Sequence, residues 1–319
     1  MGGVLFKARY LMPCFCFLIA FLQMNAGHAL LRSQDDASKQ ANAVLALMSY
    51  SAIPDLASSS LSISNANTGN PQIAMSQIGG GATMSTDFPI YLEGAVAYSR
   101  YDPVFIASNG TDERKIPVKW TSGTLQAGIG YDFMIAEHWA IRPIFNMAAG
   151  VVTSDMKIAS ALVGAYLGRE IEFLDGGSMT VGGLGGSLML DYEFHAPDAH
   201  DIDFEARYSY IHLQTMGGST SVKGYSDSST GSLYYRYRAP IDEWKVLQKP
   251  FRYVLEGSLS HYMGDQAGVL GFDYLTSVGL GVELDSSAYK VWVTRTRLVA
   301  RYMFGVDVTG YSFGLACSF

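Results

Sequence analysis

Apolar and polar residues alternate along most of this chain from about residue 57 onward. The clearest alternation covers residues 272–285. One face of that stretch carries Phe272, Tyr274, Val278, Leu280, Val282 and Leu284, and the other carries Asp273, Ser277, Gly279, Gly281, Glu283 and Asp285, with Leu275 as the exception. A period of two is typical of a β-strand with one apolar face. The length of the stretch suits a tilted strand that crosses a membrane, which needs about 9–11 residues.

The same alternation predicts ten strands between residue 88 and residue 319. They lie near 88–99, 118–133, 139–152, 184–195, 202–210, 231–239, 251–261, 272–285, 290–304 and 307–319. Two Ser- and Gly-rich stretches, 58–65 and 72–84, fit as additional strands on either side of a turn sequence at 67–71. We therefore expect about twelve antiparallel strands, or ten if those two stretches are not strands.

Alternation alone fits two folds, because a soluble sandwich buries its apolar face whereas a membrane barrel turns that face to lipid. Three features favour the barrel: the strands are long, the face opposite the apolar one is rich in Gly, Ala and Ser, and aromatic residues gather at strand ends, where membrane interfaces would lie. These aromatic residues are Phe88, Tyr98, Tyr192, Phe194, Tyr302 and Phe304. We predict an all-β, membrane-spanning, antiparallel up-and-down β-barrel.

Loop lengths predict how the barrel is oriented. The breaks near 134–138, 196–200 and 285–289 are short, and the break at 240–249 is longer. The alternate breaks, near 102–117, 153–177, 217–230 and 264–271, are mostly long. Outer-membrane barrels have short periplasmic turns and longer external loops. We therefore expect the second set of breaks to face the outside of the cell.

Residues 1–29 have the features of a secretory signal peptide: Lys7 and Arg9 precede an apolar run at 11–22, and Ala29 ends a small-residue cleavage site. The apolar run is too short to span a membrane as a helix, although an uncleaved anchor is the alternative. Beyond it, no stretch is apolar enough for a transmembrane helix. We expect a signal peptide (1–29), an N-terminal helix (30–56) and a barrel (57–319), exported through the periplasm to the outer membrane of a Gram-negative cell.

Residues 33–52 have the composition of a helix, with Ser33 as the N-cap and Pro54 beyond the end. One stripe of this helix carries Ala37, Ala41, Val44 and Met48. A helix of about 20 residues is roughly 30 Å long, which matches the height of a barrel. We predict that it plugs the lumen; the alternative is a helix in the periplasm. A second short helix is expected at 159–173, within an external loop.

Composition excludes several classes of protein. Only 16% of the residues are charged, 13% are aromatic and the net charge is −7, which argues against a disordered chain and against a nucleic-acid-binding protein. Three Cys are too few for a disulfide scaffold, and cleavage after Ala29 would leave Cys317 alone. Gly is abundant at 34 residues, as expected for a crowded all-β protein.

The last predicted strand has apolar residues at alternating positions up to a terminal aromatic residue, namely Tyr311, Phe313, Leu315, Cys317 and Phe319. This pattern resembles the C-terminal signal that the barrel assembly machinery reads in outer-membrane proteins. We expect Tyr311, Phe313, Leu315 and Phe319 to form that signal.

The segment from Gly130 to Phe133, followed by Trp139-Ala140-Ile141-Arg142-Pro143, is similar to a strand–turn–strand of the autotransporter β-domains. A helix followed by about twelve strands also matches the plan of that family. Autotransporters carry a passenger of hundreds of residues before the barrel, whereas few residues separate Ala29 from the first predicted strand here. The chain therefore resembles solitary, passenger-less autotransporter barrels, and passenger secretion does not carry over from the family.

Possible catalytic residues do not form a convincing set. His212 lies at the opposite end of its strand from Asp201 and Asp203, too far for a dyad, and His261 lacks the sequence context of outer-membrane phospholipases. His195 and His200, together with Asp198 and Asp201, could hold a metal ion, although a solvated turn is the simpler interpretation. The glycines at 182–186 lie within a predicted strand and are expected to permit a close approach of the helix or of a neighbouring strand. We expect no enzymatic activity, no cofactor and no metal site.

A set of charged side chains is expected to face the lumen: Arg295, Arg297 and Arg301, with Glu93, Glu205, Glu256 and Glu283. These residues predict either a salt-bridge network that holds the plug or a patch that selects anions in a narrow pore.

Two main functions remain open. The first is a structural or interaction barrel with a helix-plugged lumen and displayed loops, and the second is a porin-like channel for small solutes. An outer-membrane hydrolase is a third alternative. The expected partners are outer-membrane lipid or lipopolysaccharide and the barrel assembly machinery, with no nucleic acid, and the expected state is a monomer.

Overall fold

The computed structural model describes residues 41–42, 44–52, 60–64, 73–85, 87–101, 104–108, 113–117, 120–154, 178–196, 200–218, 224–246, 249–285, 295–306 and 308–318. Residues 41–42 and 44–52 are helical and are called the lumen helix below. The strands are β1 (Ser60–Ser64), β2 (Ile73–Thr83), β3 (Ile90–Tyr101), β4 (Val104–Ser108), β5 (Glu113–Pro117), β6 (Trp120–Tyr131), β7 (Phe133–Ala136), β8 (Trp139–Ser154), β9 (Ser178–His195), β10 (Asp201–Gly218), β11 (Tyr225–Val246), β12 (Lys249–Gly264), β13 (Tyr274–Asp285), β14 (Arg295–Gly305) and β15 (Val308–Ser318). In the described part of the chain, no helix is both long enough and apolar enough to cross a membrane.

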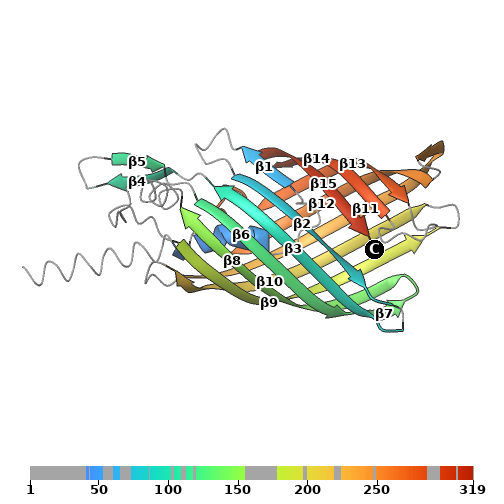
Figure 1. Cartoon of the computed structure of the whole chain (residues 1–319), viewed down its shortest axis with the longest axis horizontal. Helices are drawn as coiled ribbons and strands as arrows, with labels where there is room; N and C mark the ends of the chain where they lie inside the picture. The colour runs from blue at the N-terminus through green and yellow to red at the C-terminus, as the bar shows by residue number, and fades with distance from the viewer. Residues whose placement is uncertain are drawn as a thin grey trace, which may run out of the picture.

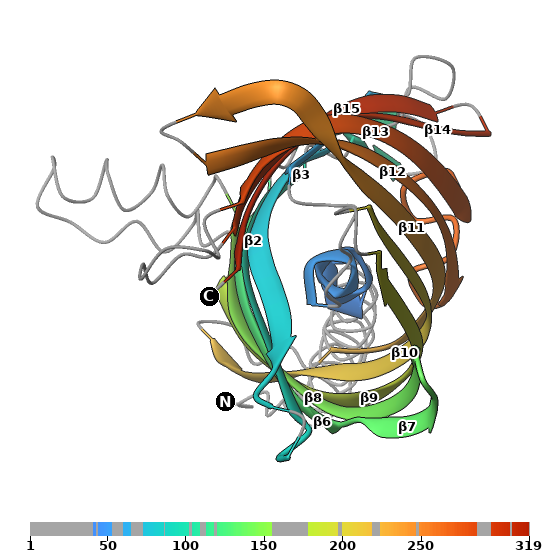
Figure 2. The same ribbon diagram turned by 90° about the vertical axis from the view of Figure 1, so that its right-hand side faces the viewer.

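The long strands close into a ring through antiparallel pairing. Successive strands are neighbours from β8 to β15, β15 pairs with β1, and β1 leads through β2 and β3 to β6. The ring closes because β6 also pairs with β8, for example at Gly128 and Asn146. Within the described residues the ring has twelve strands, while β7 only borders β8 and the β4–β5 hairpin forms a separate sheet. Figure 2 shows the ring end-on. The prediction of an antiparallel up-and-down barrel, including the two Ser- and Gly-rich strands, is confirmed.

The two ends of the barrel differ. At one end, here called the loop end, the chain passes from β3 to β6, from β8 to β9, from β10 to β11 and from β12 to β13, and the β4–β5 hairpin projects there (Figure 1). At the opposite end, here called the turn end, β7 leads into β8 and β9 leads into β10. The two predicted sets of breaks thus lie at opposite ends of the barrel.

The wall of the barrel exposes apolar side chains on its outer face and buries polar side chains on its inner face, which is the reverse of a soluble protein. On β6, Leu125 and Ile129 are exposed by 58% and 48%, whereas Gln126 between them is exposed by 1%. On β14, Leu298 and Tyr302 face outward while Arg301 is buried inside. Such a continuous apolar exterior is stable only in contact with lipid, so the barrel spans a membrane.

Aromatic side chains mark two belts on the outward face. Near the turn end, the rings of Tyr131 and Phe133 lie 4.8 Å apart, and those of Trp139 and Tyr192 lie 4.7 Å apart. Near the loop end, Tyr302 and Tyr311 are 5.4 Å apart. Amphipathic rings prefer the two membrane interfaces, so the apolar band between these belts is the segment in the hydrocarbon core.

Several predicted boundaries are wrong. Strand β11 covers much of the breaks expected near 217–230 and 240–249, because its Ser-rich start lacks an apolar face yet continues the pairing with β10. The hairpin of β4 and β5 lies within the loop expected at 102–117. Phe272 was expected to face lipid, but it precedes β13 and is buried inside the barrel. The signal peptide, residues 33–40 and the helix expected at 159–173 lie outside the described residues.

Candidate functional site: a filled barrel lumen

The lumen helix lies inside the ring of strands, toward the loop end (Figures 1 and 2). One of its faces packs against inward apolar residues of the wall, among them Val152 near the end of β8 and Met179 at the start of β9. This first cluster comprises Ala41, Val44, Leu45, Met48, Ala52, Ala148, Val152, Met179, Val181, Ile211 and Leu213. The wall is therefore apolar on the inside where it meets the helix, and burying each large apolar side chain contributes about 1.5–3 kcal/mol.

A second apolar cluster holds the other side of the helix. Leu47 and Tyr50 pack there against residues of the wall and of the β12–β13 turn. The wall and turn members are Met75, Tyr262, Leu270, Phe272, Leu275, Met303 and Val308. Leu275, the one exception to the alternation of its strand, is inward because it belongs to this cluster.

Hydroxyl and amide groups position the helix. Tyr225 donates its backbone N–H to Asn42 Oδ1 at 2.9 Å, which places the start of the helix at the loop end. Ser51 Oγ lies 3.0 Å from Thr124 Oγ1 on β6. The direction of the helix is thus from the loop end inward.

Close approach of the helix to the wall depends on a glycine, but not on those expected at 182–186. A Cβ at Gly150 would lie 2.2 Å from Met48 Cε and 2.5 Å from the carbonyl oxygen of Gly123. Gly185 instead admits the neighbouring strand, because a Cβ there would lie 2.1 Å from the carbonyl oxygen of Tyr210.

Toward the turn end, charged side chains fill the lumen. Arg207 Nη1 and Nη2 each donate to an oxygen of Glu93 at 2.8 Å, and both side chains are buried. Asn146 Nδ2 donates to the same carboxylate at 2.6 Å and Gln126 Nε2 at 3.2 Å. A carboxylate buried in this way is stabilised because every oxygen has donors.

A second group surrounds Arg142, whose guanidinium donates to Asp132 and, at 2.8 Å, to Asp191. Thr83 Oγ1 also donates to Asp132, at 2.6 Å. The guanidinium carbon lies 4.0 Å from the centre of the Tyr91 ring, which adds a cation–π contact.

A third group joins β10, β11, β12 and β13. Arg252 bridges Asp201, at 2.6 Å, and Glu283. Arg236 and Arg238 both pair with Asp203, at 2.5 and 3.0 Å. Each of these charges is matched by a partner on another strand.

The predicted set of luminal charges is only partly brought together. Arg301 pairs with Glu256 at 2.5 Å, while Arg297 lies 3.6 Å from Glu256 and 3.7 Å from Glu283. Glu93 pairs with Arg207 instead of with this set, Glu205 lies opposite Asp191 in the register of β9 and β10, and Arg295 lies opposite Asp285. Among the described residues, both members of each of these ion pairs belong to the wall, and the described part of the helix carries no charged side chain. The pairs therefore tie strands to one another and not to the helix.

Comparison with solved structures finds proteins of similar fold. No family model matches the sequence, and no curated protein matches it. The β-domain of the Bordetella autotransporter BrkA is similar, with 14% identity and a TM-score of 0.46, over 82% of this chain and 96% of that chain. The translocator domain of the autotransporter NalP from Neisseria meningitidis is similar over 80% of this chain and 83% of that chain (12% identity, TM-score 0.43). The NanC porin is similar over 82% of this chain and 98% of that chain (10% identity, TM-score 0.37). The assignment as a barrel rests on the strand pairing described above.

A polar cluster that the sequence did not reveal lies on the outward face near the loop end. His212 Nδ1 is 2.8 Å from Asp227 Oδ1, and Tyr210 Oη donates to the same oxygen at 2.5 Å. Only the register of β10 and β11 could have identified Asp227, because it lies directly opposite His212. Among the described residues, His212 forms no hydrogen bond with a serine, threonine or cysteine.

His261 and His195 lie next to an aromatic ring and a paired strand residue, respectively. His261 stacks on Tyr274 with ring centroids 4.1 Å apart. His195 and Asp201 face each other in register, and Asp198 lies outside the described residues. In the part of the chain that the structure describes, no three His, Cys, Asp or Glu side chains gather as a metal site requires.

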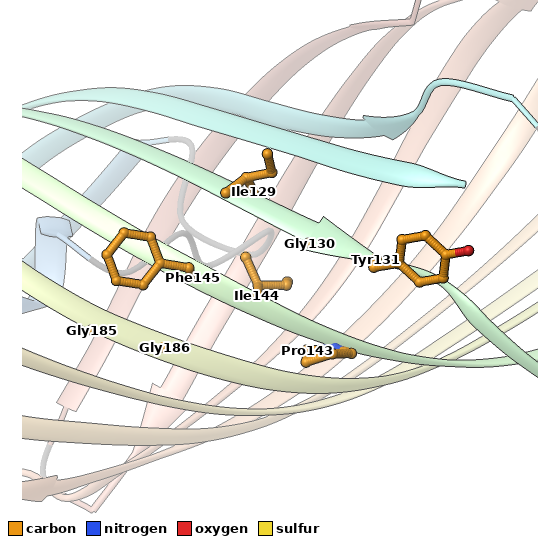
Figure 3. A pocket seen from close by; sticks show the side chains of 8 residues that line it. All are labelled: Ile129, Gly130, Tyr131, Pro143, Ile144, Phe145, Gly185 and Gly186. Atoms are coloured by element: carbon orange, nitrogen blue, oxygen red, sulfur yellow. The ribbon is translucent and has the colours of Figure 1, made fainter. Parts of the chain in front are cut away.

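A shallow hollow of about 380 Å³ lies in the wall formed by β6, β8 and β9 (Figure 3). Ile129, Tyr131 and Phe145 at its border are exposed on the outward face. Its remaining lining residues are Gly130, Pro143, Ile144, Gly185 and Gly186. None of these lining residues is charged.

Proposed function

We propose that the protein is an outer-membrane barrel of the autotransporter β-domain type, without a secreted passenger, whose lumen is kept closed. In this proposal it is a structural or interaction protein that displays its loop end at the cell surface, and it has no enzymatic activity. The observation that carries the proposal is that luminal guanidinium groups and carboxylates are buried against one another. An open aqueous pore would leave such groups hydrated.

The orientation supports surface display. The connections at the loop end include the β4–β5 hairpin and the β12–β13 turn, and longer connections of such barrels face outward. The start of the lumen helix lies at the same end. The turn end then faces the periplasm of a Gram-negative cell.

The proposed partners follow from the outward face. Tyr311 and Phe313 of β15 are both exposed by 66% toward lipid, in the arrangement expected of a signal for the barrel assembly machinery. The side chains of Leu315 and Phe319, the other members of that signal, lie outside the described residues. Outer-membrane lipid or lipopolysaccharide surrounds the apolar band, and we propose a monomer.

One observation favours a small-solute channel as a second candidate. The guanidinium of Arg297 is 3.6–3.7 Å from its carboxylate partners, whereas that of Arg301 is 2.5 Å from Glu256. A loosely held guanidinium could exchange its partners for a passing anion.

Conductance of the purified barrel in planar bilayers tests the proposal. We expect the unsubstituted barrel to stay at the baseline. A variant without residues 30–55 is also expected to stay near the baseline, because the ion pairs between wall strands remain. A triple variant, Glu256→Ala, Arg297→Ala and Arg301→Ala, should conduct only when residues 30–55 are also removed.

Each preparation is first shown to be folded by its heat-modifiable mobility in gels. A steady open level in the unsubstituted barrel would refute the closed lumen and favour the channel. Turnover of a lipid or peptide by the pure protein that is lost in His212→Ala or His261→Ala would instead favour a hydrolase.

A further inference from the structure

The β12–β13 turn, residues 265–273, folds back into the barrel at the loop end. Gln266 is exposed by 0%, and Leu270 and Phe272 are also buried. The backbone takes a positive φ at three glycines, with values of 74° at Gly264, 68° at Gly268 and 84° at Gly271. Since L-residues rarely adopt this conformation, glycines at these places allow the turn to reverse sharply at both of its ends.

Gln266 connects the lumen helix to the barrel wall. The side-chain Oε1 of Gln266 lies 3.0 Å from Ser49 Oγ, and the backbone carbonyl oxygen of Gln266 accepts a hydrogen bond from Tyr50 Oη at 2.7 Å. Its Nε2 donates to the carbonyl oxygen of Ser229 at 2.6 Å and to Thr230 Oγ1 at 2.7 Å. One side chain thus fixes both the helix and the turn.

Aromatic packing reinforces this contact. The Tyr50 ring of the helix lies 4.7 Å from that of Tyr262 and 6.4 Å from that of Phe272. Two hydrogen bonds also hold the β12–β13 turn to β11. Asp265 donates its backbone N–H to the carbonyl oxygen of Asp227 at 2.8 Å, and its Oδ2 accepts the backbone N–H of Asp227 at 2.7 Å.

Two other polar contacts of the helix, those of Asn42 and Ser51, are made with Tyr225 of β11 and Thr124 of β6. Thr124 belongs to β6, which is paired on both sides, so it cannot move without breaking the barrel. The β12–β13 turn joins two strands but is not itself part of the ring. We propose that this turn is a latch that retains the helix in the lumen and that its opening exposes the helix to the loop side. The latch presupposes the closed lumen proposed above, and it deepens that proposal by naming what controls it.

Thiol labelling from the outside of intact cells tests the latch. The reporter is Ala46→Cys on the helix, which is exposed by 2% in the closed state, in a full chain that also carries Cys14→Ser, Cys16→Ser and Cys317→Ser. Gln266→Ala removes the latch bonds of the side chain, and Thr124→Val is the matched control because it removes a polar contact between helix and wall.

We expect Gln266→Ala to raise the labelling rate on the order of tenfold to a hundredfold, because three side-chain hydrogen bonds are lost. Thr124→Val should change the rate less than threefold. If Gln266→Ala does not give a heat-modifiable barrel, Leu270→Ala replaces it, with Leu213→Ala on the wall as its control.

Equal rates in the latch variant and its control would overturn the proposal, as would an unchanged rate in the latch variant. Conductance of the unsubstituted barrel decides the closed lumen separately. A barrel that conducts would refute the closed lumen, whereas a barrel that stays at the baseline but shows equal labelling rates would refute the latch alone.

Discussion

The buried pair of Arg207 and Glu93 provides a quantitative test of how the lumen is stabilised. Arg207→Ala removes two charge-assisted bonds to Glu93, each of 2.8 Å, and leaves a carboxylate whose side chain is exposed by only 2%. Asn146 and Gln126 remain as donors, but neither is charged. Breaking a buried pair from one side costs about 3–5 kcal/mol. We expect a loss of that size in the free energy of unfolding.

The assay is urea unfolding of the barrel in lipid vesicles, followed by the shift between folded and unfolded mobility in gels. The double variant Arg207→Met with Glu93→Gln removes both charges and should recover most of the loss, since replacing both partners is often nearly neutral. Glu137→Ala, at the exposed β7–β8 turn, is the control and should change stability by less than about 0.5 kcal/mol. A loss below about 1 kcal/mol for Arg207→Ala, as for an exposed ion pair, would refute the reasoning.

Three further predictions concern the wall, the helix and the last strand. Leu125→Arg, in the middle of an outward face, should destabilise the barrel by about 2–4 kcal/mol in the same urea assay, and a neutral result would contradict the contact with lipid. Gly150→Ala should cost about 1–3 kcal/mol, because the new Cβ meets the carbonyl of Gly123 as well as the movable end of Met48; an unchanged unfolding midpoint would show that the helix does not approach there. Removal of Phe319 should lower the amount of heat-modifiable barrel in outer membranes while refolding of the pure chain into vesicles is unchanged; equal losses in both would assign Phe319 a role in stability instead of assembly.

The alternation of apolar and polar residues predicted which side chains point into the lumen, because this depends on the sequence of a single strand and not on which strands pair with it. It predicted that Glu256 and Arg301 point inward, and both are buried in the lumen. It did not predict their partners, because pairing depends on register: Arg207 and Glu93 are 114 residues apart.

Two other features were missed for different physical reasons. Ile211 and Leu213 face inward although they are apolar, because the lumen helix and not water lies against them. The sequence of the buried β12–β13 turn shows no alternation of apolar and polar residues. Its contacts with the helix, such as that of Gln266 with Ser49, form only because the folded barrel brings the two segments together.

The ion pairs that join β10 to β11 act as a check on strand alignment. In the observed register Asp201 lies opposite Arg238 and Asp203 lies opposite Arg236. A slip of two residues keeps every side chain on its own face, so apolar patterning does not oppose it. The same slip sets Asp203 against Tyr234, or Asp201 against Pro240, so one of the two directly opposed pairs of carboxylate and guanidinium is lost. Ion pairing between neighbouring strands therefore opposes a two-residue slip that the alternation of apolar and polar residues permits.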